Sequence, residues 1–124
     1  MTGVQTCALP ILSQQGIGYL HLIEPQVRAG LVAEMNMSAP ESVCKLFRPV
    51  FAGPLIASGG FTAQSAEAAL NAGYADLVAF ARMFIANPDL PKRLIAGAPL
   101  NVPNPKTFYG GGEGGYTDYP HLNV

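Results

Sequence analysis

The chain has 124 residues, a length that permits one ordinary domain. With 49% hydrophobic and only 12% charged residues, its composition excludes a disordered chain and predicts a packed core. The formal net charge is -1, and the Lys and Arg residues form no block that could follow nucleic acid or an anionic membrane. No run approaches the roughly eighteen apolar residues that span a bilayer, and no secretion signal is visible. We expect a cytoplasmic protein without nucleic-acid or membrane partners.

The first eleven residues, MTGVQTCALPI, resemble the translation of a sequencing adapter joined to a truncated reading frame. We therefore expect residues 1–11 to be a non-native tail and the native sequence to begin near Leu12. The alternative is a native N-terminal extension. Cys7 belongs to this tail, and Cys44 lies too far away to form a CxxC motif with it. Both cysteines are predicted to be unpaired.

The native part begins with the end of a helix and a strand. Leu12 to Gln15 are typical of a last helical turn, and Gly16 suits the left-handed residue that ends it. Tyr19 to Glu24 are short and rich in bulky apolar residues, which predicts a buried parallel strand. Residues 25–37 show no clean period, and in a barrel such a segment would lie over the active-site face.

The clearest helix start is Ser38–Ala39–Pro40–Glu41, a capping box with a proline in the first turn. Pro49 and Gly53 close this helix. The apolar residues that follow at helical spacing are Val43, Leu46, Phe47 and Val50.

A second strand and helix follow. Pro54 to Ser58 form the predicted strand, and Gly59-Gly60 free the backbone where that strand turns toward a helix. Thr62 is the expected N-cap, and Gly73 is the expected end of the helix. The thin apolar stripe of this helix consists of Ala63, Ala66, Ala69 and Leu70.

Asp76 to Phe80 predict a third strand, which leads into Ala81-Arg82. Asn87-Pro88-Asp89 then supply an N-cap, a proline at the first helical position and an acid near the positive helix end. Gly97 stops this helix. A proline-rich extended segment follows and leads into a glycine-rich tail from Gly110 to Gly115.

Strands and helices alternate, with connections long enough for parallel pairing, so the fold class is α/β with three strands. A complete eight-stranded α/β barrel takes roughly 250 residues. The chain can therefore supply only part of a barrel, with two unpaired strand edges and one apolar face that lacks a partner.

Ser58, Gly59 and Gly60 after one strand, and Ala81-Arg82 after the next, form a candidate phosphate site. Backbone N–H groups at two neighbouring strand ends can converge on one anion, and a guanidinium can bond two phosphate oxygens. The structural alternative is a pair of tight turns and a surface arginine.

Gly110, Gly112 and Gly115 satisfy the pattern GxGxxG, but a dinucleotide-binding fold needs a strand before it and a helix after it. Because proline-rich coil precedes these glycines, we interpret them as a loop. Phe108 and Tyr109 beside them could instead form an aromatic wall next to a flat ligand, although these residues alone favour ordinary packing.

The remaining polar candidates have plain explanations. His21 has no second ligand at a suitable spacing, so we interpret it as a core histidine and predict no metal site. Glu24 ends a strand, where barrel enzymes place catalytic groups and loop anchors alike, and its role is left open. His121 is expected to be solvated and Cys44 to be inert.

Several separated motifs in order, YLHLIEP, GPLIASGGFTAQSAEAALNAG, ADLVAFARMFIANPDLPKRL and TFYGGGEGGYTDYP, resemble the C-terminal third of the Old Yellow Enzyme family. The resemblance covers residues 12–124 and is closest to the branch with N-ethylmaleimide reductase-like and 12-oxophytodienoate reductase-like proteins. It implies the C-terminal part, about three β/α units, of an FMN-binding barrel. Such enzymes take hydride from NAD(P)H and pass it to activated alkenes such as α,β-unsaturated carbonyls, by chemistry that belongs mainly to the flavin.

By this resemblance Ser58, Gly59 and Gly60 would follow the seventh strand and Ala81-Arg82 the eighth, and together they would hold the FMN phosphate. Phe108 would lie near the flavin ring, and Tyr109 would also touch the substrate. The family usually has glycine before the arginine, and the methyl group of Ala81 implies modestly weaker FMN binding.

The family's catalytic side chains belong to upstream strands, so no catalytic residue is assigned and the chain alone is expected to be inactive. Two alternatives remain from the sequence: a phosphate-binding module that completes a barrel with a separate chain, and a fragment of a phosphate-binding barrel without flavin. Substrate identity, the choice of NADH or NADPH, and oligomeric state are governed by residues upstream.

Overall fold

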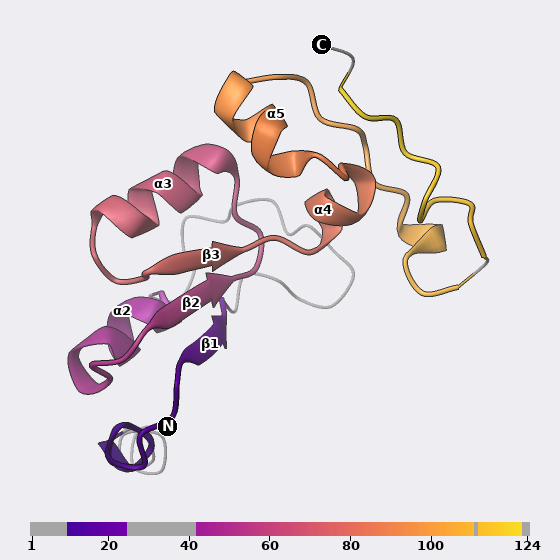
Figure 1. The fold of residues 1–124 in the computed structure, drawn as a ribbon. Coiled ribbons are helices and arrows are strands. Elements are labelled where there is room, and N and C mark those ends of the chain that lie inside the picture. The colour runs from indigo at the N-terminus through magenta and orange to yellow at the C-terminus, as the bar shows by residue number, and fades with distance from the viewer. Residues whose placement is uncertain (1–9, 25–41, 111, 123–124) are drawn as a thin grey trace. The chain divides into compact units, whose positions relative to one another are not determined.

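The computed structural model describes residues 10–24, 42–110 and 112–122. The chain forms two compact units, residues 1–79 and 80–124, and each is described by itself. In the first unit, strands β1 (Leu20–Ile23), β2 (Leu55–Ser58) and β3 (Leu77–Ala79) form one parallel sheet in the order β1-β2-β3 (Figure 1). The predicted α/β alternation with three parallel strands is confirmed.

The three strands end level with one another at their carboxyl ends. Ile23 lies opposite Ser58, and Ser58 lies opposite Ala79. Because the strands are parallel and in this register, the segments that follow them all leave the sheet at its carboxyl end. Ligands bind at this end in open and closed α/β sheets.

The core of the first unit lies on one face of the sheet. Helices α2 (Val43–Phe47) and α3 (Ala63–Asn71), with the short 3₁₀ helix η1 (Arg48–Val50), accompany the strands. The buried core residues are Cys44, Leu55, Ala57 and Ala75, against which Leu22, Phe47, Phe61, Tyr74 and Val78 pack. Strand residues that point to this face alternate with residues of the other face.

The other face of the sheet is open. Ile23 is 69% exposed and Leu77 is 57% exposed, although both are large apolar residues. His21 shares this face of β1 with Ile23 and is also exposed. The interpretation of His21 as a core histidine is therefore wrong, because among the described residues β1 has a packed partner on only one of its two faces.

Most of the predicted boundaries of α3 are confirmed. The Thr62 side chain accepts a hydrogen bond from the Ser65 N–H and forms a capping box with it, and Gly73 has a φ of 75° after the helix. Ala66 and Ala69 are buried, which lets the helix approach the sheet closely. Leu70, predicted in the same stripe, is 41% exposed and lies outside this contact.

Helix α2 begins later than predicted. Its N-cap is Ser42, whose hydroxyl accepts a hydrogen bond from the Lys45 N–H, whereas the predicted capping box of residues 38–41 lies outside the described residues. The predicted loop over residues 25–37 lies outside them too. The helix tightens into η1 at Pro49, which cannot donate a helical hydrogen bond, and Leu46 is left 55% exposed.

The second unit contains α4 (Arg82–Ala86), α5 (Leu90–Ala96) and the 3₁₀ helix η2 (Pro105–Thr107). Helix α4 was not predicted. The third strand ends at Ala79, and the helix begins at Arg82. The N-cap of α5 is Asp89 and not Asn87. Gly97 ends α5 with a φ of 60°, as expected.

The segment after α5 is extended as far as Asn104, and turns follow η2 through the described glycines. Neither a strand before this glycine-rich stretch nor a helix after it occurs among the residues that the structure describes, so the rejection of a dinucleotide fold is confirmed. His121 is exposed, as expected. No helix in the described ranges is long and apolar enough to cross a membrane.

Candidate functional site

The carboxyl end of β2 carries two consecutive glycines in conformations that other residues rarely adopt. Gly59 has a φ of 105° and Gly60 a φ of 68°. They follow Ser58, the last residue of β2, which is paired with Ala79 at the end of β3. Consecutive N–H groups in such a turn can form a concave anion site. The glycine turn at this strand end is therefore a candidate anion site.

The Ser58 side chain has a structural partner. Its hydroxyl donates a hydrogen bond of 3.1 Å to the Leu22 carbonyl on β1. This bond ties β2 to β1 one residue before the glycine turn. The Ser58 hydroxyl hydrogen is thus already bonded within the sheet. The backbone N–H groups of the glycine turn are therefore the groups at this strand end that could bind a ligand.

Ala81 and Arg82 open the second unit. Ala81 is the N-cap of α4 and provides no side-chain hydrogen bond, and Arg82 is the first residue of that helix and half-buried. Within the second unit as described, the Arg82 guanidinium has no hydrogen-bond or ion-pair partner. Arg48 and Arg93, by contrast, form ion pairs of 2.8 Å and 2.7 Å with Asp76 and Asp89.

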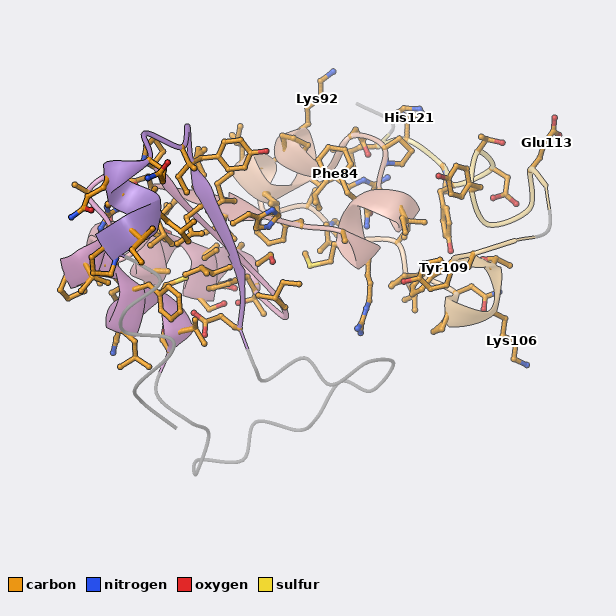
Figure 2. The ribbon with its side chains drawn as sticks, turned by 90° about the horizontal axis from the view of Figure 1, so that it is seen from below. Phe84, Lys92, Lys106, Tyr109, Glu113 and His121 are labelled. Carbon is orange, nitrogen blue, oxygen red and sulfur yellow. The ribbon has the colours of Figure 1, made fainter. Side chains whose placement is uncertain are left out.

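Phe108 and Tyr109 contact each other just after η2. Their rings meet edge to face with 6.3 Å between centroids and an interplanar angle of 89°. Phe108 is half-buried, whereas Tyr109 is 99% exposed and projects from its segment (Figure 2). A phenol this open is free to contact a ligand through both its ring and its hydroxyl.

Glu24, whose role the sequence left open, caps helix α2. Its carboxylate accepts hydrogen bonds from the Ser42 hydroxyl at 2.6 Å, the Val43 N–H at 2.9 Å and the Cys44 N–H at 3.4 Å. Glu24 is only 5% exposed. A negative charge at the start of a helix satisfies N–H groups that lack helical partners. Both carboxylate oxygens are engaged in this contact, so Glu24 acts as an anchor.

Cys44 is a buried, free thiol in the core of the first unit. Burial, together with the charge and hydrogen bonding of Glu24, raises the pKa of Cys44 to about 12. A thiol with so high a pKa carries almost no thiolate at neutral pH and is a poor nucleophile. The prediction that Cys44 is inert agrees with this environment.

The sequence reasoning missed two features of the second unit. One is a shallow hollow of about 280 Å³ lined by Ala81, Phe84, Ile85, Pro88 and Tyr116. The other is a network of polar side chains that holds the C-terminal segment, in which Asn87 and Arg93 are buried and Asp89 and Asn101 are partly buried. The four-residue spacing of Asp89 and Arg93 was a usable signal for an ion pair on one helix face.

In the part of the chain that the structure describes, no three His, Cys, Asp or Glu side chains gather as a metal site would require. The predicted site residues fall in both units: Ser58, Gly59 and Gly60 belong to the first, and Ala81, Arg82, Phe108 and Tyr109 belong to the second.

Comparison with known proteins decides the family. Residues 5–101 match the NADH:flavin oxidoreductase / NADH oxidase family. The chain belongs to this family, which is the Old Yellow Enzyme family expected from the sequence. Its members are FMN-dependent NAD(P)H oxidoreductases.

Individual members of the Old Yellow Enzyme family match nearly the whole chain. A 12-oxophytodienoate reductase-like protein of Solanum lycopersicum is 45% identical over 117 residues, which is 91% of this chain and 29% of the relative. 12-Oxophytodienoate reductase 2 of Arabidopsis thaliana is 45% identical over 90% of this chain and 29% of its own length. The chain thus spans less than a third of these relatives.

Solved structures of the Old Yellow Enzyme family share the fold. Morphinone reductase superposes with a TM-score of 0.79 at 46% identity, over 94% of this chain and 30% of that one. The old yellow enzyme homologue of Zymomonas mobilis gives a TM-score of 0.81 at 34% identity, over 96% of this chain and 32% of its own. The three parallel strands and their helices therefore match part of the barrel of this family.

Proposed function

We propose that the chain is the C-terminal third of an FMN-dependent, NAD(P)H-using oxidoreductase whose whole form reduces activated alkenes such as α,β-unsaturated carbonyls. Family membership supports the reaction class. The names of two relatives, 12-oxophytodienoate reductase and morphinone reductase, point to small enone-type substrates. Bound FMN would supply the hydride-transfer chemistry, and the residues of this chain would position it.

The main observation behind this proposal is that β2 and β3 end at paired residues. Ser58 lies opposite Ala79, so the glycine turn after β2 and the segment that continues from β3 leave the sheet at neighbouring points. Gly59 and Gly60 would offer backbone N–H groups to the FMN phosphate, and Ser58 would hold the start of their turn through its bond to Leu22. A phosphate site formed by loops after neighbouring strands recurs in many barrels.

Ala81 and Arg82 would complete this phosphate site from the other strand. The Arg82 guanidinium has no other partner in the described second unit, so forming a bidentate bond with phosphate would break no contact there. The Ala81 methyl group stands where the family usually has glycine, and it would crowd the approaching phosphate slightly.

Phe108 and Tyr109 would serve the other end of the cofactor. Phe108, braced edge-on by its neighbour, would lie beside the flavin ring, and the exposed Tyr109 would contact the substrate. No residue of this chain is assigned to proton or hydride transfer. The isolated chain should therefore be inactive even when FMN and NADPH are supplied.

A hybrid protein tests this proposal. In it the chain replaces the segment that it matches in morphinone reductase, where the two are 46% identical. The purified hybrid should be yellow, contain FMN and reduce 2-cyclohexenone with NAD(P)H, while the isolated chain shows no turnover. A correctly folded hybrid that ignores added FMN would sink the proposal, and turnover by the isolated chain would show that catalytic groups lie within it.

The open sheet face favours one alternative, a module that completes its barrel with a separate chain. Ile23 and Leu77 are large and exposed there, and apolar surface of this kind needs a cover. Co-expression with the remaining part of morphinone reductase as a separate polypeptide would reveal such pairing as a stable, flavin-containing complex. A fragment of a barrel without flavin is disfavoured by the family match.

A further inference from the structure

The C-terminal segment of the second unit is held at two places by polar side chains, of which Asn87 and Arg93 are buried. Arg93 on α5 donates from one terminal nitrogen to the Pro99 carbonyl and from the other to the Pro120 carbonyl, each at 2.7 Å. These two carbonyls are 21 residues apart in the chain. One side chain thus joins the stretch that leaves α5 to the stretch that returns from the glycine-rich turns.

Asp89 fixes Arg93 in this position. Its carboxylate accepts a hydrogen bond of 2.7 Å from the Arg93 Nε and another of 2.7 Å from the Leu122 N–H. The Arg93 side chain is only 5% exposed and the Asp89 side chain 9%. The Arg93 guanidinium therefore satisfies an acid and two carbonyls at once, in a geometry that a lysine ammonium cannot reproduce.

Two asparagines extend the same contact. Asn101 donates from its side-chain amide to the carbonyls of Ala86 and Pro120, each at 2.8 Å, and its N–H donates to the Asn87 side chain at 2.7 Å. Asn87 is fully buried and also donates to the Met83 carbonyl at 2.8 Å. We call Asn87, Asp89, Arg93 and Asn101 the tail clasp.

The tail clasp closes the base of a loop that carries both aromatic site residues. The described residues between its two arms, 105–110 and 112–118, are called the aromatic loop, and Figure 2 shows Tyr109 and Glu113 on it. At the base, the Asn104 N–H donates to the Tyr119 hydroxyl at 2.9 Å. This bond joins the two ends of the loop to each other, and the flanking residues Asn101 and Pro120 are held by the helices of the second unit through the tail clasp.

The aromatic loop is also closed internally. The Gly115 N–H donates to the Asp118 carboxylate at 2.7 Å, and Gly115 has a φ of 74°. A Cβ at Gly115 would collide with the Thr107 side chain, the residue just before Phe108. The far side of the loop therefore packs directly against the segment that presents the two rings.

From these contacts we propose that Arg93, held by Asp89, is a positioning residue for Phe108 and Tyr109: it sets where the aromatic loop stands at the flavin edge. The inference rests on the proposed function for the roles of the two rings, but the anchoring itself is a property of this chain. Tyr109 makes almost no other contact, since it is 99% exposed, so its place depends on where the loop is held.

The test compares the hybrid with its Arg93→Ala and Arg93→Lys variants, and with Lys92→Ala as a control. Lys92 is the exposed neighbour of Arg93 on α5 and points into solvent (Figure 2). In Arg93→Ala, backbone amides of the aromatic loop should exchange hydrogen about fivefold faster or more, while amides of α3 keep their rates. Arg93→Lys should lie between the two, and Lys92→Ala should match the parent.

Kinetics supply the second readout. With FMN content unchanged, Arg93→Ala should raise the KM for 2-cyclohexenone on the order of tenfold and change kcat less, because the substrate contact is misplaced while the cofactor stays. Adding Tyr109→Phe should then cost little more, since a misplaced hydroxyl has already been lost. A merely structural Arg93 would lower thermal stability and leave the KM of the FMN-loaded fraction untouched.

The outcomes separate the two hypotheses. Unchanged exchange in the aromatic loop of Arg93→Ala, or an unchanged KM at full FMN content, overturns the positioning role. A parent hybrid without FMN refutes the proposed function instead, and loop exchange still decides the anchoring. If Arg93→Ala does not fold, Arg93→Lys carries the test. Gly115→Ala, which distorts the loop while leaving the tail clasp intact, then shows separately whether the loop geometry sets the KM.

Discussion

Ser58 and Ala79 lie opposite each other at the carboxyl ends of two neighbouring parallel strands. Each is followed by a segment that the proposed phosphate site requires, Gly59-Gly60 in one case and Ala81-Arg82 in the other. The pairing fixes the start of each segment through backbone hydrogen bonds of the sheet. The register of the two strands therefore sets where the proposed site begins. A site that starts from paired strands is held more rigidly than a site built on loops alone.

Replacement of Arg82 should weaken FMN binding. In the hybrid, Arg82→Ala should raise the Kd for FMN about ten- to a hundredfold, because hydrogen bonds to a charged group contribute about 1.5–3 kcal/mol. Arg82→Lys should lose less, since it keeps the charge. Fluorescence titration of the apoprotein with FMN measures the effect, and exposed Lys106→Ala serves as control. Equal affinity of Arg82→Ala and parent would remove Arg82 from the site.

Removal of the Ala81 methyl group should strengthen FMN binding. Ala81→Gly restores the residue that the family usually has before the arginine, and the phosphate could then approach the backbone more closely. We expect the Kd for FMN to fall about two- to fivefold, an amount of the size expected when a small clash is relieved. The same titration measures it. A weaker Kd would mean that the added backbone freedom of glycine outweighs the space gained.

Loss of the Glu24 carboxylate should destabilise the fold without a specific effect on cofactor binding. Glu24→Ala leaves the N–H of Val43 and the hydroxyl of Ser42 without their acceptor, at a cost of about 3 kcal/mol. Glu24→Gln should cost less because it keeps one acceptor oxygen. Urea unfolding of the hybrid gives both values, and exposed Glu67→Ala on α3 is the matched control. A strong loss of kcat at full stability would instead restore a catalytic role for Glu24.

Asp89 should make stability fall at acidic pH. The hydrogen bond from Arg93 and that from the Leu122 N–H lower the pKa of Asp89 from its ordinary 3.8 to about 2. A lowered pKa in the folded state gives stability that is complete above the unfolded value and is lost as pH falls through about 2. The hybrid should exceed Asp89→Asn in unfolding free energy at pH 6, and the gap should shrink between pH 4 and pH 2. A gap that is constant over this range would contradict the ion pair.

Cys44 should resist thiol reagents until the protein unfolds. Its pKa of about 12 lies three units above the ordinary 9.0, so its thiolate fraction at pH 8 falls about a thousandfold. In a hybrid with every other cysteine replaced, including Cys7→Ser, reaction with a chromogenic disulfide should be slow and should become fast in urea. Rapid reaction of the native protein would show that the core around Cys44 opens readily.

Much of the first unit could be predicted because local signals agreed there with tertiary structure. The strand at Leu55–Ser58, the cap at Thr62 and the end at Gly73 each follow from turn and capping chemistry within a few residues. The exposure of His21 and Ile23 could not be inferred in this way. The pattern of a strand that is apolar on both faces predicts full burial, whereas the described part of this chain covers only one face of β1.

The second unit was harder to predict because its structure depends on contacts distant in sequence. Asn87 has the residue type of an N-cap and stands before a proline, yet it is buried and bound to Asn101 fourteen residues later. Arg93 has the residue type of an exposed helix position, and its carbonyl partners at Pro99 and Pro120 carry no side-chain signal. Ala81 and Arg82 followed from their place after a strand, whereas resemblance to a family was needed to assign Phe108 and Tyr109 to a site, because no periodicity or spacing marks them.

The contact between Glu24 and the start of α2 has a consequence for how this fold can vary. The Glu24 carboxylate, at the end of β1, binds residues 42–44 directly. The start of α2 is therefore held beside the end of β1 by a contact that does not involve positions 25–41. Lengthening a connection adds closure entropy only slowly. Evolution or engineering could therefore exchange that stretch without rebuilding the contact between β1 and α2.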